Sequence, residues 1–203
     1  MLDYFFDGMN VYQLVVWFFI FSFLGWAMEC VVIRREKGYW ENRGFAKMPF
    51  CVIYGFGVFA ACILFKPISH NYIALYFAGA IGATAFEYLT AKVMQYLFGE
   101  VWWDYTHKKF NYKGILCLES TIGWGFLALF IFGFLNKAVQ NVVRAMNVKF
   151  VALLSLLLFF GYLIDFSYHF IHSYHNNQNS DTDEPVLDEF EEDEDYTDMK
   201  NAW

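Results

Sequence analysis

Five long apolar runs constrain what this chain can fold into. Because an α-helix rises about 1.5 Å per residue, about 20 mainly apolar residues cross the hydrocarbon core of a bilayer. Four of the runs reach that length, and the run at 50–65 is shorter. It would need flanking residues or local bilayer thinning to cross, or it would form a re-entrant hairpin. The runs are 11–33, 50–65, 72–98, 115–135 and 150–172.

Composition supports the same class of fold. The 203 residues are 58% hydrophobic and only 17% charged, against about 45–50% and about 25% in soluble domains. Acidic residues crowd the end of the chain, with eleven Asp or Glu and one lysine between 181 and 203. We therefore predict an all-α, polytopic membrane helix bundle of about five transmembrane helices over 1–175. A disordered, acidic cytoplasmic tail is expected over 176–203.

Basic residues in short loops predict the orientation in a cell membrane. The loops 34–49 and 99–114 are rich in lysine and arginine, so we place them in the cytoplasm. The N-terminus would then be outside and the C-terminus inside. Basic residues in the segment 136–149 weaken this asymmetry. The first run follows no basic segment and is too long for a cleaved signal, so we expect it to remain as a helix.

Acidic residues inside four of the runs are the first functional candidates. A charge at the centre of a span costs about 2.5–3.5 kcal/mol on insertion scales, so such residues usually face a cavity or a partner. We expect Glu29, Glu87 and Glu119 to face one pocket that opens to the cytoplasm. The alternative is that Glu29 and Glu119 form structural ion pairs with nearby arginines, such as Arg43.

The two basic loops resemble each other. Trp40 and Asn42 precede Gly44 in the first loop, and a Tyr-Gly pair at 54–55 follows; Trp103 and Asn111 precede Gly114 in the second, and a Trp-Gly pair at 124–125 follows. The spacing between the two glycines is eleven residues in both loops. We therefore predict two parallel helix-loop-helix repeats plus a fifth helix, with a binding site between the repeats.

Charged, amide and indole side chains in these loops predict how the repeats are joined. Arginine forms bidentate pairs with carboxylates, so we expect Arg43 to reach Asp104 or Glu119. The amides of Asn42 and Asn111 would bond the backbone of the facing loop. Tryptophan favours the membrane interface, and Trp102 and Trp103 would close the pocket from below.

Several motifs resemble those of the CmpB-type ABC-transporter permeases, small bacterial membrane proteins with vertebrate relatives known as transmembrane protein 229. The resemblance covers about 20–135 and implies a membrane protein of the permease class. Three positions depart from the family pattern, with Val52 for a proline, Gln95 for a glutamate and Thr106 for a serine. The motifs are SFLGWAME (22–29), NRGF (42–45), YGFG (54–57), EY (87–88), WWDY (102–105), NYKG (111–114) and WG (124–125).

A transporter subunit with a polar pocket is the leading functional hypothesis. The sequence has no G-x-x-x-x-G-K-[ST] motif, so an ABC permease of this kind would need an ATPase on another chain. A homo-oligomer is the other expected assembly, the lipid bilayer is the surrounding partner, and no cofactor or nucleic acid is expected. Two alternatives stay open. One is a membrane-embedded enzyme acting on a lipid or head-group with the same acids, and the other is a structural or regulatory membrane protein.

A weaker candidate site lies in the fifth run. Asp165, His169 and His172 recur at helical spacing and share one face, which could hold zinc. Histidines near the end of a span more often anchor it at the interface.

Overall fold

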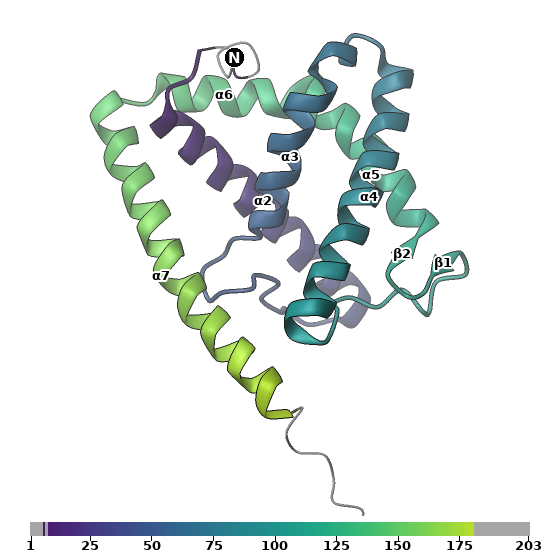
Figure 1. The fold of residues 1–203 in the computed structure, drawn as a ribbon. Coiled ribbons are helices and arrows are strands. Elements are labelled where there is room, and N and C mark those ends of the chain that lie inside the picture. Colours follow the sequence, from purple (N-terminus) through teal and green to yellow (C-terminus); the bar gives the residue numbers. More distant parts are fainter. Residues whose placement is uncertain (1–5, 7, 181–203) are drawn as a thin grey trace, which may run out of the picture.

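The computed structural model describes residue 6 and residues 8–180, and almost all of them are helical (Figure 1). Two short strands, β1 (Asn111–Tyr112) and β2 (Leu116–Cys117), pair antiparallel in one loop. The all-α prediction is therefore confirmed. The helices are α2 (Val11–Lys37), α3 (Val52–Phe65), η1 (Lys66–Ile68), α4 (Tyr72–Phe98), α5 (Leu118–Phe130), η2 (Ile131–Leu135), α6 (Asn136–Ala145) and α7 (Val148–Ser180).

Four helical stretches in the described part are long and apolar enough to cross a membrane. A fifth apolar helix, Val52–Ile68, is shorter. Large apolar side chains cover much of the surface, including Phe77, Ile81 and Ile164, which suits contact with lipid rather than water. The four stretches are Val11–Arg35, Tyr72–Phe98, Leu118–Ala145 and Val148–Tyr174.

Local sequence signals explain where helices α2 and α4 begin and end. The side chain of Asn10 caps α2 and that of Asn71 caps α4, and each accepts a backbone N–H of the first turn. Gly38 and Gly99 terminate these helices in the left-handed conformation, at φ +82° and +75°. A residue with a β-carbon is strained there, so glycine gives both helices a defined end.

The helices form two hairpins. Helix α2 packs against α3, and α4 packs against α5. Both connecting loops lie at one end of the molecule, together with the end of α7, whereas α6 crosses the opposite end (Figure 1). Helix α7 continues through Ser180, past the predicted start of the tail at 176. The rest of the predicted acidic tail, 181–203, lies outside the described residues.

The shortest span is explained by the loop before it. Loop 38–51 turns back along α2, and the Cys51 backbone N–H donates to the Ser22 carbonyl at 3.0 Å. Ala46 and Phe50 of this loop are buried against Phe19. Helix α3 begins part of the way through the bundle and runs on to the far end (Figure 1). The run at 50–65 thus does not form a re-entrant hairpin; the loop before it is the part that folds back.

Candidate functional site between the two hairpins

Each hairpin holds one glutamate with an aromatic donor from its second helix. The Tyr54 hydroxyl of α3 donates to Glu29 of α2. The Trp124 indole N–H of α5 donates to the Glu87 Oε2 of α4 at 3.0 Å. Each donor stands directly before a buried glycine, in the Tyr-Gly and Trp-Gly pairs. Both intramembrane carboxylates therefore have a fixed hydrogen-bond partner.

A second pair of contacts follows the same spacing. A β-carbon added at Gly55 would lie 2.8 Å from the Phe18 ring, and one at Gly125 would lie 2.5 Å from the Tyr76 ring. Phe18 and Tyr76 are 58 positions apart, as are the two glutamates, and Gly55 and Gly125 are 70 apart, as are the two donors. Two independent contacts thus align the hairpins in the same register, and this agreement supports the predicted repeat.

The hairpins meet at the two donors. The rings of Tyr54 and Trp124 are 6.1 Å apart, centroid to centroid. Tyr105, from the second loop, donates its hydroxyl to the Glu87 Oε1 at 3.1 Å. Burial, followed by the charges of Glu87 and Glu29, raises the pKa of Tyr105 well above its usual range. Tyr105 therefore stays a proton donor, and the charges of both glutamates act on it.

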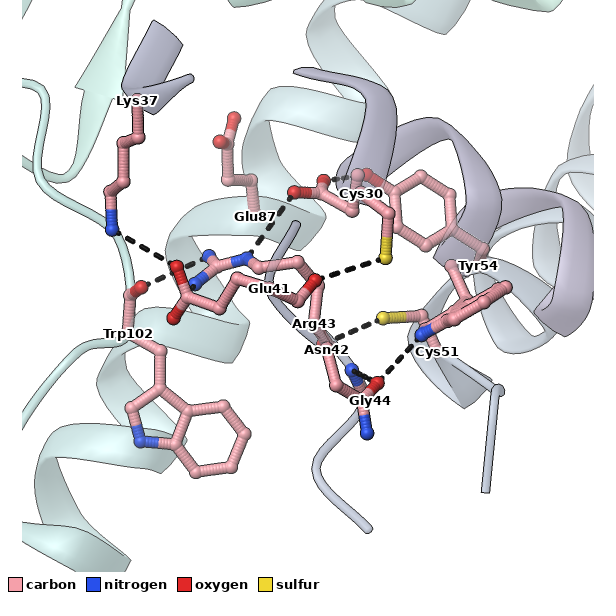
Figure 2. Close-up of polar contacts among 12 residues, drawn as sticks. Cys30, Lys37, Glu41, Asn42, Arg43, Gly44, Cys51, Tyr54, Glu87 and Trp102 are labelled. Carbon is pink, nitrogen blue, oxygen red and sulfur yellow. Dashed lines mark hydrogen bonds and ion pairs between the residues drawn. The ribbon is translucent and has the colours of Figure 1, made fainter. Parts of the chain in front are cut away.

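Arg43 links the first loop to the second (Figure 2). Its Nη2 donates to the Trp102 carbonyl at 3.1 Å. Its Nε lies 4.0 Å from the Glu29 carboxylate, and its Nη1 lies 3.8 Å from Glu41. The prediction that Arg43 pairs with Asp104 or Glu119 is wrong. The acids come from its own hairpin, and a backbone carbonyl supplies the contact with the other hairpin.

The two predicted asparagine cross-links are also wrong. The Asn42 carbonyl oxygen accepts from the Trp26 indole and from the Gly44 backbone N–H, all within the first hairpin. The Asn111 amide donates to the Lys108 carbonyl within the second loop. Each amide satisfies backbone groups of its own turn, which is the common local role of asparagine.

Two further predicted acids lie away from the glutamate pair. Asp104 accepts from the backbone N–H and the hydroxyl of Thr106, both at 2.8 Å, and the backbone bond first of all holds the Asp104 pKa below its usual range. Glu119 is 69% exposed and pairs with Lys108 at 2.9 Å. The alternative of an ion pair with an arginine is confirmed for Glu29, which lies 4.0 Å from Arg43, whereas Glu119 pairs with a lysine instead.

The two loop tryptophans have different roles. Trp102 stacks on Phe45 of the first loop, with centroids 5.0 Å apart and planes 10° apart. The Trp103 indole donates to the Ile115 carbonyl at 2.8 Å, within its own loop. Trp102 therefore joins the loops, whereas Trp103 only shapes the second one.

One of the three candidate metal ligands of α7, Asp165, binds the first loop instead. The Asp165 Oδ2 accepts the Met48 backbone N–H at 2.8 Å, and the His169 Nδ1 lies 3.4 Å from the Asp165 Oδ1. The His172 ring lies parallel to Tyr168, with centroids 6.5 Å apart. Over residues 6 and 8–180, no three His, Cys, Asp or Glu side chains are grouped to hold a metal ion. The weak zinc prediction thus finds no support, and Asp165 anchors a loop.

Sequence reasoning missed Tyr54, Tyr105 and Trp124 as partners of the glutamates. Tyr54 and Trp124 were noted only as markers of the repeat. The equal glycine spacing aligns Tyr54 with Trp124, but Tyr54 follows Glu29 by 25 positions and Trp124 follows Glu87 by 37, so no constant offset links each donor to its glutamate. Tyr105 has no counterpart in the first loop, so no repeat signal could have identified it.

Two cavities of about 420 Å³ each are among those in the described part of the bundle. One lies among apolar side chains of α2, α3 and α7, and the other lies between η1 and α6. Neither is lined by Glu29 or Glu87. The glutamates instead make the closed set of contacts described above.

These features define a multi-pass helical membrane protein with a polar centre between two related hairpins. The model of the family described as "Putative ABC-transporter type IV" matches residues 16–170, so the chain belongs to this family of CmpB type. The match extends past the second hairpin and includes most of α7. Searches of curated proteins and of solved structures gave no match.

Proposed function

We propose that the chain is the membrane subunit of a transporter and that its substrate site is centred on Glu29 and Glu87. The observation that supports this most is the repeated glutamate-aromatic pair, with both donors in contact between the hairpins. Binding sites between parallel repeats are common in transporters. The family description points to the same class of function.

The chemistry of this centre favours a positively charged substrate group. Glu29 and Glu41 lie beside the guanidinium of Arg43, and Glu41 also pairs with Lys37. Glu87 accepts from the neutral donors Tyr105 and Trp124. Glu87 forms no ion pair with a described residue, so a cation beside it would compensate its charge. The rings of Tyr54 and Trp124 add electron-rich faces, which attract cations.

An ATPase would drive the transport, as the family description implies. No nucleotide-binding motif occurs in the 203 residues, so a separate chain would supply ATP hydrolysis. The loop end of the bundle is the side on which we place this partner. We assign that end to the cytoplasm because loops 34–49 and 99–114 are basic.

The experiment begins with the tagged chain extracted in mild detergent from its native membrane. Mass spectrometry of the purified complex should identify an ATPase, and the complex in liposomes should hydrolyse ATP. Glu29→Gln and Glu87→Gln should each reduce this hydrolysis to background. The unfolding temperature should be unchanged or higher for Glu87→Gln and lower for Glu29→Gln, because the latter removes a partner of Arg43. Removing a buried charge eases insertion.

Glu119→Gln is the matched control, because it removes an acid that is 69% exposed and paired with Lys108. It should leave ATP hydrolysis intact. The transporter proposal is wrong if no ATPase is present and the purified chain alone converts a lipid substrate, which would support the enzyme alternative. Full activity in both glutamate variants would remove the proposed site.

The proposed orientation has its own test. A reporter that is active only in the cytoplasm, fused after Trp203, should be active. A fusion before α2 should be inactive. The reverse pattern at normal expression would invert the assignment.

A further inference from the structure

The cavity at the other end of the bundle has the opposite electrostatic character. It lies between the α3–α4 turn and α6, and α6 crosses the end that faces away from the loops (Figure 1). Three permanent cations line it, Lys66, Lys137 and Arg144, together with His70. No Asp or Glu is among its lining residues within the described part of the chain.

The polar face of α6 forms one wall of this cavity. Asn136, Gln140 and Arg144 recur every four residues, and Lys137 lies three residues before Gln140, so these residues fall on one side of the helix. The Trp17 indole donates to the Asn136 Oδ1 at 2.9 Å and fixes that amide in place. The wall therefore combines cationic groups with positioned amides.

The side chain of Gln140 lies in this wall of the cavity. Gln140 is only 3% exposed, and its side chain makes no hydrogen bond with any residue that the structure describes. The Gln140 amide keeps access to the cavity, so its N–H groups can donate to a ligand there. Lys137 likewise forms no ion pair with a described residue. These two side chains provide a donor and a charge for an anion.

We propose that this cavity binds a phosphate-bearing anion, held by Lys66, Lys137 and Arg144 and by the Gln140 amide. Amino, guanidinium and amide N–H groups are the donors that phosphate oxygens accept. A volume of about 420 Å³ lies within the usual range of ligand pockets. The phosphate can belong to a lipid head-group or to a soluble anion.

The proposal also explains why basic residues occur at both ends of the bundle. The asymmetry of lysine and arginine between the two sides is weak because the segment 136–149 contributes Lys137, Arg144 and Lys149. If two of these residues serve an anion site, their charges reflect ligand binding rather than orientation.

The test measures thermal unfolding of the purified full-length chain in an uncharged detergent. Inorganic phosphate is compared with chloride at matched ionic strength, and phosphatidylglycerol is compared with phosphatidylcholine in the same micelles. A ligand at tenfold its Kd should raise the unfolding temperature by about 4 °C. A shift with inorganic phosphate identifies a soluble anion, and a shift with phosphatidylglycerol alone identifies a lipid head-group.

Lys66→Gln with Lys137→Gln should abolish the shift. Lys47→Gln with Lys109→Gln removes the same charge at the other end and should keep it. If the first double variant does not fold, Lys137→Gln alone should reduce the shift by at least half. The proposal is overturned if neither probe stabilises the wild-type chain, or if the site and control variants respond equally.

Discussion

The two hairpins place a glutamate and its aromatic donor in the same register, yet they build different loops. Loop 38–51 folds back into the bundle and buries Ala46 and Phe50. Loop 99–117 stays at the end of the bundle and forms the short β1–β2 ribbon. The contact between helices, not the loop, is therefore what the two hairpins share.

The second helices of the two hairpins, α3 and α5, differ in length because their loops differ. In the first hairpin the loop folds back along α2, so α3 starts part of the way along the bundle and has only 14 residues. In the second, the helical stretch that begins at Leu118 extends for 28 residues through a π-helical turn into α6. A π-helical turn breaks the regular hydrogen-bond ladder, and the chain bends there onto the end of the bundle (Figure 1).

The largest expected effect comes from the arginine that joins the two loops. The Arg43 side chain is 15% exposed and lies beside Glu29. Breaking a buried ion pair typically costs about 3–5 kcal/mol, and the 4.0 Å separation places Arg43→Ala near 3 kcal/mol. Lys108→Ala affects a pair in which Glu119 is 69% exposed, and it should cost less than about 1 kcal/mol. Reversible unfolding in mixed micelles would give both values, and equal losses would show that Arg43 is not a structural link.

Crowding the first hairpin should have the next largest effect. A β-carbon at Gly25 would lie 2.2 Å from the Tyr54 Cγ, close to the backbone of α3, so the ring cannot move away easily. Gly25→Ala should therefore lower the free energy of unfolding by about 2 kcal/mol. Gly123→Ala meets nothing within 4 Å and should be neutral or slightly stabilising. The same unfolding measurement distinguishes them, and a neutral Gly25→Ala would mean that the hairpin is loosely packed.

Substitution of the two loop asparagines, Asn42 and Asn111, would compare the stability of the loops directly. Asn42 connects Trp26 of α2 with the loop backbone, whereas Asn111 serves only its own turn. Asn42→Ala should cost about 1.5 kcal/mol and Asn111→Ala about half as much, since each lost bond contributes about 0.5–1.5 kcal/mol. Amide hydrogen exchange should show opening of 38–51 in the first variant. A larger loss for Asn111→Ala would reverse the order of importance.

The smallest expected effect is a loss of stability of the second loop at low pH. Hydrogen bonds from Thr106 hold the folded pKa of Asp104 below that of the unfolded chain. Their stabilisation is present above the unfolded pKa of about 3.9 and is lost as pH falls through the folded pKa. The protection factor of the Thr106 amide, which corrects for the intrinsic pH dependence of exchange, should therefore fall below about pH 4. Asp104→Asn should remove this pH dependence, and an unchanged profile would assign it to another group.

Much of the architecture could be predicted from single stretches of sequence. Apolar length alone predicted the helices, because an unpaired backbone cannot cross lipid. Asn10, Gly38, Asn71 and Gly99 mark helix ends through local capping. The repeat could also be predicted, because the spacing from Gly44 to Gly55 equals that from Gly114 to Gly125. The helix contacts of the two hairpins have the same register.

The partners of the polar residues were decided only by the tertiary structure. Sequence showed that Arg43, Asp104, Glu119 and Asn111 are polar residues near a membrane, but not which way each one faces. Loop 38–51 folds back into the bundle, and this places Arg43 beside Glu29 rather than beside Asp104. A loop path depends on the summed burial of several apolar side chains against distant helices. No short motif encodes such a sum, whereas the length of an apolar helix is encoded residue by residue.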